Sequence, residues 1–306
     1  MNVLITGGAG YVGTRLVKQL SMDDHVTKIF VYDNLIRGNF NLFLGDKFLN
    51  SNKIEFMHGD ILDSRKLRQV MASIDVVYHL AAKVTSPFAN INMHFYEQIN
   101  NWGTAELVYA IEDSNVSKVV YMSSMGVYGF SDEAINENST LHPSSFYAIS
   151  KQRGEEHMNR LSEKVKTIIV RCGNVYGYGR SMRFDAVINK FVFEANFNKK
   201  ISIHGNGKQN RSFVHIASLG KILAQLALSD VPSGIYNVSE RNLTVIDIAE
   251  TLKELIPDLE FMFVNQQISF NQQIINNDQK LKKYIDYGDK SFFKEEIKQF
   301  VSSFSF

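Results

Sequence analysis

Short runs of apolar, often β-branched residues recur through the first half of the chain. They show no polar alternation, which is typical of strands buried on both faces of a sheet. Segments with a helical period separate them, so strands and helices alternate. This order predicts an α/β fold with a doubly wound parallel sheet and right-handed crossovers. The six predicted strands span residues 3–6, 29–32, 54–57, 76–80, 119–122 and 167–170.

The clearest helices between these strands cover residues 99–112 and 146–161. After about residue 175 the alternation becomes less regular. We therefore expect a dinucleotide-binding domain over residues 1–174 and a smaller C-terminal substrate lobe over 175–306, with some segments crossing back to the first domain. The later predicted elements are strands at 200–203 and 234–238 and helices at 184–195, 217–228, 245–256 and 292–304.

A glycine-rich turn follows the first predicted strand and opens a helix at Tyr11. The spacing of Gly7, Gly10 and Gly13 suits a tight turn, close approach of the backbone to a pyrophosphate, and close packing of helix on sheet. The positive end of the helix dipole would face the anion. Asp33 ends the second strand, where an acid holds the adenosine ribose hydroxyls and repels a 2′-phosphate. The sequence thus predicts a Rossmann-like site for NAD rather than NADP.

Composition excludes several classes of protein. The 33 basic and 32 acidic residues give a net charge of +1, which indicates no nucleic-acid surface. The single cysteine, Cys172, rules out an intrachain disulfide and suits a reducing compartment. The histidines show no paired ligand spacing, so we expect no metal. No stretch approaches the roughly 20 apolar residues that cross a bilayer. We expect a soluble, cytoplasmic protein with no membrane contact.

Tyr147 and Lys151 lie four residues apart on a predicted helix and so share one face. A nearby ammonium group, supplemented by the positive nicotinamide ring of bound NAD, stabilises phenolate, which would lower the pKa of Tyr147 from its usual value of about 10. Tyr147 is then a candidate general base, although a surface tyrosine beside an unrelated lysine has the same spacing. Upstream, Ser123 and Ser124 end a strand. A hydroxyl there could hydrogen-bond a substrate alcohol, although serines at strand ends are ordinarily turn formers.

Taken in order, these motifs resemble the extended short-chain dehydrogenase/reductases, in the branch of NAD-dependent nucleotide-sugar epimerases and dehydratases similar to UDP-glucose 4-epimerase. The resemblance covers nearly the whole chain. The segment 236–238 resembles the family's strand in the sugar-nucleotide lobe. Further matching stretches are 33–35, 59–61, 79–82, 100–104, 171–177 and 211–215.

The resemblance implies a set of cofactor contacts. Asp60 and Ile61 would frame the adenine, and Lys151 would bridge the nicotinamide ribose and Tyr147. Ala81 and Ala82 would leave room for the cofactor backbone. The full implied set is Gly7, Gly10, Tyr11, Val12, Gly13, Asp33, Asn34, Asp60, Ile61, Leu80, Ala81, Ala82, Lys83, Asn100, Ser123, Tyr147, Lys151 and Cys172.

The resemblance also implies a nucleotide-diphospho-sugar as substrate. Ser124 would contact the sugar, and Asn174 and Arg211 would hold the diphosphate, since a guanidinium suits bidentate phosphate contact. A turn asparagine and a solvated arginine are the alternative interpretations. The family further implies a homodimer, formed through the helices at 99–112 and 146–161.

The implied chemistry is hydride transfer. Tyr147 as phenolate takes the proton of a sugar hydroxyl while the carbon's hydride moves to the nicotinamide, with Ser124 hydrogen-bonded to the same oxygen. Return of the hydride to the opposite face of a transient 4-keto sugar gives an epimer. We therefore expect an NAD-dependent epimerase.

Three other functions stay open. An NAD(P)H-dependent reductase of a nucleotide-4-keto-(deoxy)sugar would use the same residues. A 4,6-dehydratase is disfavoured, because the acid and base that follow the Ser/Thr in those enzymes are here Met125 and Gly126. An NAD-sensing regulatory protein would need the glycine loop but not Ser124, Tyr147 and Lys151 together.

The chain departs from the family pattern in two places. Lys83 stands where many relatives have a neutral polar residue. The region 266–273 is rich in glutamine where epimerases often carry a diphosphate-binding arginine. The stretch 180–185, with Arg180 and Arg183, could supply basic contacts instead, or could be a solvated helix start.

Overall fold

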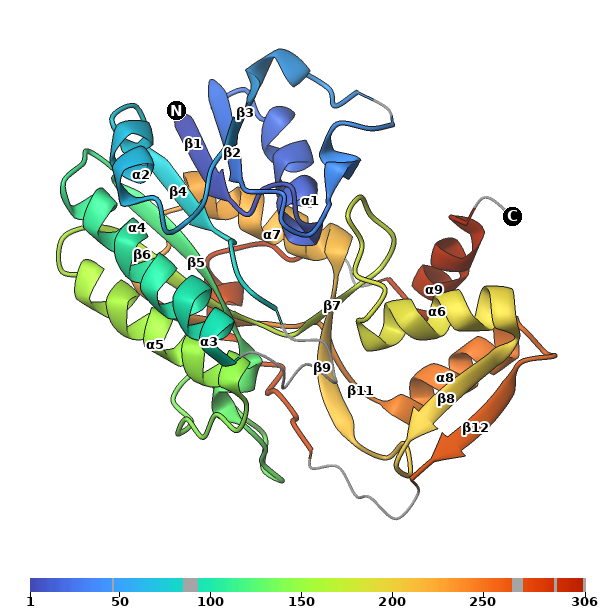
Figure 1. The fold of residues 1–306 in the computed structure, drawn as a ribbon. Helices are drawn as coiled ribbons and strands as arrows, with labels where there is room; N and C mark the ends of the chain where they lie inside the picture. Colours follow the sequence, from blue (N-terminus) through green and yellow to red (C-terminus); the bar gives the residue numbers. More distant parts are fainter. Residues whose placement is uncertain (46, 85–92, 266–271, 289–290, 305–306) are drawn as a thin grey trace.

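The computed structural model describes residues 1–45, 47–84, 93–265, 272–288 and 291–304. This part of the chain is organised by a seven-stranded, fully parallel sheet (Figure 1). The order reverses between β1 and β4, and their carboxyl ends form the switch point where ligands bind in such sheets. From edge to edge the strands are β10 (Gly234–Val238), β6 (Lys166–Cys172), β5 (Lys118–Ser124), β4 (Val76–His79), β1 (Asn2–Thr6), β2 (Lys28–Asp33) and β3 (Ile54–His58).

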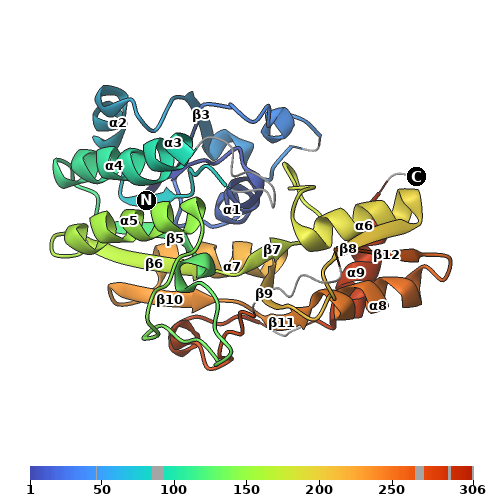
Figure 2. The ribbon, with the colours of Figure 1, turned by 60° about the horizontal axis from the view of Figure 1, so that its bottom comes forward.

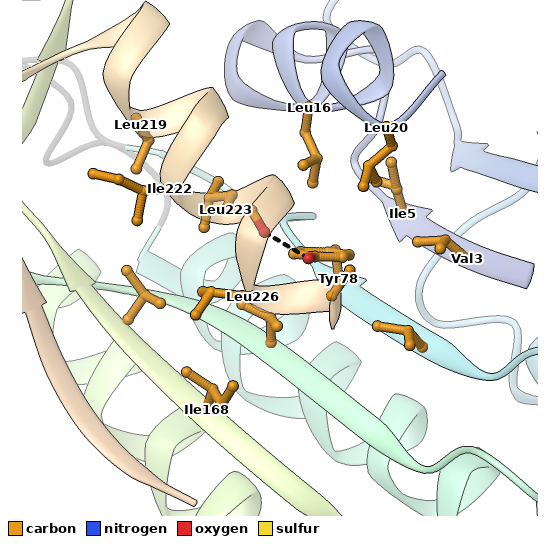
Figure 3. Packing of buried hydrophobic residues seen from close by; sticks show 14 of the residues in the cluster. Val3, Ile5, Leu16, Leu20, Tyr78, Ile168, Leu219, Ile222, Leu223 and Leu226 are labelled. Carbon is orange, nitrogen blue, oxygen red and sulfur yellow. Dashed lines mark hydrogen bonds between the residues drawn. The ribbon is translucent and has the colours of Figure 1, made fainter. Parts of the chain in front are cut away.

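Helices cover both faces of this sheet, which confirms the predicted doubly wound fold. On one face lie α1 (Tyr11–Ser21) and α7 (Ile216–Leu228), whose leucines pack on β1, β4 and β6 (Figure 3). The hydroxyl of Tyr78 donates to the carbonyl oxygen of Leu223 at 2.6 Å beneath α7. The other face carries α2 (Ser64–Met71), α4 (Gly103–Glu112) and α5 (Phe146–Leu161).

The helix predicted at 146–161 is α5, with the same bounds. The helix predicted at 99–112 begins earlier and is not uniform: α3 (Met93–Tyr96) leads into a π-helical segment, η3 (Glu97–Trp102), and then α4. This wider segment carries Asn100, which is fully buried. The sequence analysis left out α2, whose eight residues contain few apolar positions.

A smaller lobe is built on two short sheets in the described residues (Figure 2). Its core is formed mainly by Phe191, Ile203, Ile248 and Phe300. One sheet has the order β11 (Arg241–Thr244), β9 (Asn210–His215), β7 (Asn174–Tyr176), and the other pairs β8 (Lys200–His204) with β12 (Glu260–Val264). The helices of this lobe are α6 (Val187–Asn198), α8 (Val245–Leu255) and α9 (Phe293–Ser302).

One prediction about the lobes is wrong. The segment 236–238 does not lie in the smaller lobe, because β10 pairs in parallel with β6 at the edge of the large sheet. Strand pairing is non-local, so the sequence neighbours of β10 did not indicate its sheet. Since α7 also packs on the large sheet, the chain returns to the first domain after entering the second, and the boundary at 174/175 stays a prediction.

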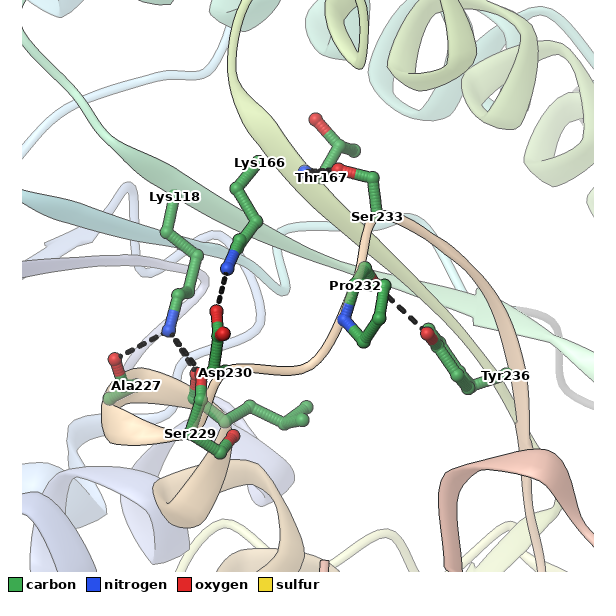
Figure 4. A network of polar contacts seen from close by, with 10 residues as sticks. Lys118, Lys166, Thr167, Ala227, Ser229, Asp230, Pro232, Ser233 and Tyr236 are labelled. Atoms are coloured by element: carbon green, nitrogen blue, oxygen red, sulfur yellow. Dashed lines mark hydrogen bonds and ion pairs between the residues drawn. The ribbon is translucent and has the colours of Figure 1, made fainter. Parts of the chain in front are cut away.

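A polar network holds the end of α7 against the amino ends of the large sheet's strands (Figure 4). The ammonium group of Lys118 donates to the carbonyl oxygens of Leu226, Ala227 and Ser229 at 3.0, 2.8 and 2.8 Å. These carbonyls end α7 and carry the partial negative charge of its dipole. Lys118 thus caps α7 from β5.

Candidate active site

The glycine loop lies at the switch point, between the carboxyl end of β1 and α1. Gly7 has φ +71°, and a Cβ atom there would lie 2.6 Å from the backbone nitrogen of Ala81. A Cβ on Gly13 would lie 2.5 Å from the carbonyl oxygen of Gly7. Side chains at these positions would fill the loop, so the cradle that the structure forms fits a pyrophosphate at the start of α1.

Asp33 lies beside this cradle at the end of β2. Its carboxylate accepts hydrogen bonds from the backbone nitrogens of Ala9, at 3.1 Å, and Leu35, at 2.9 Å. Asn34 donates to the carboxylate of Asp60 at 2.8 Å, which joins the ends of β2 and β3. The structure therefore brings these three predicted residues together with the glycine loop.

His79, at the end of β4, has a role that the sequence analysis missed. Its two ring nitrogens lie 2.8 Å from Thr6 Oγ1 and 2.9 Å from Thr104 Oγ1. Burial, and then the charge of Lys151, lower the pKa of His79 well below its usual range. A neutral ring that bridges two hydroxyls holds β4 beside β1 and so sets the position of Leu80 and Ala81.

Both the oxygen and the nitrogen of the Asn100 side chain form hydrogen bonds within the protein. Its oxygen accepts from the backbone nitrogen of Lys83 at 2.8 Å, and its nitrogen donates to the Lys83 carbonyl and to Ser150 Oγ, both at 2.9 Å. Asn100 therefore fixes the segment after β4 relative to α5. Lys83 itself is exposed, with its ammonium 6.0 Å from the ring centre of Phe95. Cofactor contacts of Asn100 and Lys83 stay predictions.

The structure brings Ser124 and Tyr147 together. Ser124 ends β5 and accepts from the Gly126 nitrogen at 3.1 Å. Tyr147 lies in the first turn of α5, which Ser145 caps. Burial raises the pKa of Tyr147, whereas its hydrogen bond with Ser124 and the charge of Arg183 act in the opposite direction. In the chain itself, desolvation outweighs both favourable contacts. The predicted fall in the pKa of Tyr147, which also depended on the positive nicotinamide ring, stays a prediction.

Lys151 lies one turn further along α5 and is only 2% exposed. Its ammonium group donates to the carbonyl oxygen of Met122 at 2.7 Å and lies 4.6 Å from the ring centre of Tyr121. Burial lowers the pKa of Lys151 to about 7, against the opposing effect of Glu155. The sequence spacing gave the correct helix face, but not this carbonyl partner.

Two other predicted cofactor residues are buried. Ser123 is 2% exposed, and its hydroxyl donates to Glu155. Cys172, at the end of β6, is 7% exposed, and burial raises the pKa of its thiol to about 12. Their side chains are part of the packed wall behind the site.

Asn174 and Arg211 lie on neighbouring strands of the smaller lobe. The Asn174 side chain donates to the Ser212 carbonyl at 3.1 Å, and Arg211 donates to the Asn210 carbonyl at 2.8 Å. The Arg211 guanidinium lies 5.3 Å from the ring centre of Phe130, and burial lowers its pKa. Both side chains thus belong to one small sheet, and their contact with a diphosphate stays a prediction.

Gln273 joins this sheet to the turn after Ser124. Its backbone nitrogen donates to the Asn210 carbonyl at 3.1 Å, and its side chain donates to the Met125 and Gly129 carbonyls, both at 2.8 Å. The sequence analysis treated this glutamine only as a missing arginine. Residues 266–271 of that region lie outside the described residues.

A segment of the second lobe, residues 177–181, crosses the glycine loop, and we term it the strap. The carbonyl oxygen of Gly177 accepts from the Tyr11 hydroxyl, and the Ser181 hydroxyl donates to the Ala9 carbonyl at 2.8 Å. Arg180 donates to the Leu42 carbonyl at 3.4 Å, and its guanidinium lies 4.4 Å from the ring centre of Phe48. The strap therefore ties the second lobe to α1 and to the loop after β2.

Arg183 follows the strap and forms an ion pair with Asp185 at 2.6 Å. Its charge acts on both Tyr147 and Tyr11. The stretch 180–185 is therefore not a solvated helix start: it packs against the glycine loop and reaches the electrostatic environment of Tyr147. Among the residues that the structure describes, no group of His, Cys, Asp or Glu could hold a metal ion, and no helix has the length and hydropathy of a membrane span.

Fold and site together define an enzyme of the short-chain dehydrogenase/reductase class. The chain belongs to the NAD dependent epimerase/dehydratase family, whose model matches residues 3–239. The family's cofactor confirms the prediction of NAD.

Relatives carry names of both activities. A dTDP-D-glucose 4,6-dehydratase of Mus musculus is 32% identical, over 84% of this chain and 73% of that protein. The structure of a UDP-glucuronic acid 4-epimerase from Bacillus cereus, in complex with UDP-glucuronic acid and NAD, has a TM-score of 0.87 at 22% identity, covering 99% of this chain and 98% of that one. A UDP-N-acetylglucosamine 4-epimerase from Methanobrevibacter ruminantium has a TM-score of 0.84 at 25% identity, covering 98% and 97%.

Proposed function

We propose that the protein is an NAD-dependent epimerase of a nucleotide-diphospho-sugar that acts through a transient 4-keto intermediate. The observation that carries the proposal is the strap. Residues from the second lobe hydrogen-bond across the glycine loop, so we expect a cofactor held in the loop to leave slowly, when those contacts open. A retained cofactor that is regenerated in each turnover suits an epimerase better than a reductase, which must exchange its nicotinamide.

In the proposed reaction, Tyr147 takes the proton of the sugar hydroxyl at its phenolic oxygen. Ser124, whose hydroxyl lies close enough to Tyr147 to favour its phenolate, would hold the same substrate oxygen. The charge of Arg183 favours the phenolate. Bound NAD supplies the acceptor for the sugar's hydride and the donor for its return. Tyr147 then returns the proton when the keto group is reduced on its other face.

The residues after Ser124 argue against elimination of water, although several relatives are named dehydratases. Met125 is buried and Gly126 has no side chain, so neither transfers a proton. A Cβ atom at position 126 would lie 3.3 Å from Ser124 Oγ. A larger residue there would press on the serine that the proposed reaction needs.

Asn174 and Arg211 would bind the diphosphate, on the small sheet that Gln273 connects to the turn after Ser124. We also propose a homodimer through η3, α4 and α5. The exposed aromatic side chains Trp102, Tyr109 and Phe146 on these helices support it, with exposures of 60%, 47% and 42%. A cytoplasmic location is consistent with the reduced, buried Cys172.

The test is incubation of the purified protein with UDP-, GDP-, CDP- and dTDP-sugars and their 4-keto forms, without added cofactor. We expect epimer formation with no net change in the absorbance of reduced nicotinamide. A requirement for added NADH or NADPH would establish the reductase instead, and loss of water from the sugar would establish the dehydratase.

A further inference from the structure

A buried carboxylate lies behind the catalytic residues. Glu155, one turn after Lys151 on α5, is 2% exposed and faces Arg171 of β6, which is equally buried. Arg171 donates to it through Nη2 at 2.6 Å and through Nε at 3.0 Å. The hydroxyl of Ser123, at the end of β5, donates to the same carboxylate at 2.5 Å. One side chain thus joins α5, β5 and β6.

The placement of this cluster relates it to catalysis. Ser123 directly precedes Ser124, and Glu155 lies two turns after Tyr147 on the same helix. The carboxylate therefore fixes the strand end that carries one catalytic residue against the helix that carries the other two. On its far side, the Arg171 guanidinium lies 4.7 Å from the ring centre of Tyr128, which ends the turn after Ser124.

We propose that Glu155 is a positioning residue for the reaction. Through Ser123 it sets the distance between Ser124 and Tyr147, and through its negative charge it stabilises the ammonium form of Lys151. The inference rests on the proposed function only in taking Ser124, Tyr147 and Lys151 as the catalytic residues.

A buried pair contributes little net stability compared with apolar residues of the same size, so stability alone is a weak reason for it. Glu155 also differs from the other groups around Lys151 in its charge. The neutral His79 on β4 and the rings of Tyr121 and Tyr147 supply no negative charge in their usual forms, whereas Glu155 opposes the effect of burial on the pKa of Lys151.

The smaller lobe provides a matched control. Glu296 on α9 is 5% exposed and also pairs with an arginine, Arg241, at 3.1 Å. It accepts from the hydroxyls of Ser291 and Tyr176 as well. This cluster has the same chemistry as that of Glu155 but is formed by other elements. Changes there report the loss of a buried carboxylate without the loss of a neighbour of Lys151.

The first experiment compares Ser123→Ala with Ser291→Ala. Ser123→Ala removes the tie to β5 and leaves the Glu155–Arg171 pair intact. We expect about a tenfold fall in kcat with unchanged KM for Ser123→Ala and no fall in kcat for Ser291→Ala. Both variants should show a similar small fall in melting temperature, since each loses one hydrogen bond to a buried carboxylate. A normal kcat for Ser123→Ala would overturn the positioning role.

The second experiment compares pH–rate profiles of Glu155→Gln and Glu296→Gln. Removal of the Glu155 charge lowers the pKa of Lys151 further, so activity is lost as pH rises through a lower value. We expect the alkaline limb to move to lower pH in Glu155→Gln, to return in Glu155→Asp, and to stay in place in Glu296→Gln. Equal profiles for the two Gln variants would overturn the electrostatic role.

Two further readouts keep the outcomes separate. Where Glu155→Gln does not fold, Ser123→Ala decides the proposal, because it leaves the buried pair intact. Tyr147→Phe is measured alongside: if it keeps its activity, the proposed function is wrong. If Tyr147→Phe is inactive and both Ser123→Ala and Glu155→Gln behave as wild type, only the present inference is wrong.

Discussion

The hydroxyl of Tyr11, in the first turn after the glycine loop, donates to the carbonyl oxygen of Gly177 in the second lobe. This contact joins residues 166 positions apart in the chain. From this contact we expect release of NAD by the first lobe to depend on the position of the second lobe.

We predict that Tyr11→Phe releases NAD faster than the wild type, by roughly 3- to 10-fold, since one hydrogen bond contributes about 0.5–1.5 kcal/mol. The measurement is exchange of protein-bound NAD for isotopically labelled NAD. Tyr78→Phe is the matched control, because its hydroxyl donates to a carbonyl of α7 at 2.6 Å, within the large sheet's core. An equal exchange rate in Tyr11→Phe and wild type would show that the strap does not slow the release of NAD.

Asp33→Ala should reduce the preference for NAD over NADP. The carboxylate at the end of β2 would repel a 2′-phosphate, and its removal takes that repulsion away. The ratio of the two dissociation constants is the appropriate measurement. Asp33 also accepts hydrogen bonds from the backbone of Ala9 and Leu35. Loss of these bonds would loosen the loop and weaken the binding of NAD and NADP alike, so it would not change the ratio. An unchanged ratio would refute the ribose role.

Tyr147→Phe should lower turnover by at least about 100-fold, which is the contribution expected of a general base. NAD should stay bound, because the cradle and the strap are unaltered. Turnover and bound NAD are measured on the same sample. Near-normal turnover would exclude Tyr147 as the base and, with it, the proposed mechanism.

The local parts of this site could be predicted from sequence, and the tertiary parts could not. The glycine loop and the Tyr147–Lys151 face depend on residues close in the chain, so spacing alone indicated them. The hydrogen bond from Lys151 to the Met122 carbonyl depends on how α5 packs on β5. The effect of the Arg183 charge on the pKa of Tyr147 depends on how the second lobe packs on the first. No local pattern indicates either.

The same distinction holds for the fold. Strand 234–238 has the predicted bounds, because five consecutive residues determine them, but its sheet depends on pairing with a distant strand. The strands β7, β9, β11 and β12 were not predicted. Every residue of β11 is half-buried, and β7 has three residues, so neither shows the alternation or the apolar run that marks a strand.

Arg211→Ala should weaken binding of the nucleotide-sugar by more than about 1 kcal/mol, on the order of a charged hydrogen bond. Because Arg211 lies on β9 of the smaller lobe, NAD binding should not change. Calorimetric titration with both ligands measures the two effects. Arg68→Ala on α2, which removes an exposed arginine, should change neither. An unaltered dissociation constant for the sugar would exclude Arg211 from the site.

Lys151→Met should abolish activity yet stabilise the fold at neutral pH. Burial lowers the pKa of Lys151 from 10.5 to about 7, so between these values the unfolded chain binds more protons than the folded one. Stability attributable to this group therefore rises with pH across that window. At pH 7 nearly the whole free-energy cost of burying the ammonium group opposes folding. Near pH 10 this cost is small, because the buried amine is then neutral and the amine of the unfolded chain is also losing its proton.

An apolar side chain of similar length removes that cost but leaves the Met122 carbonyl without its donor, so we expect a net gain of roughly 1–3 kcal/mol at pH 7. The gain should shrink towards pH 10. Denaturant unfolding of both proteins at pH 7, 8.5 and 10 measures it. A gain that is independent of pH would mean that Lys151 keeps an ordinary pKa in the folded protein.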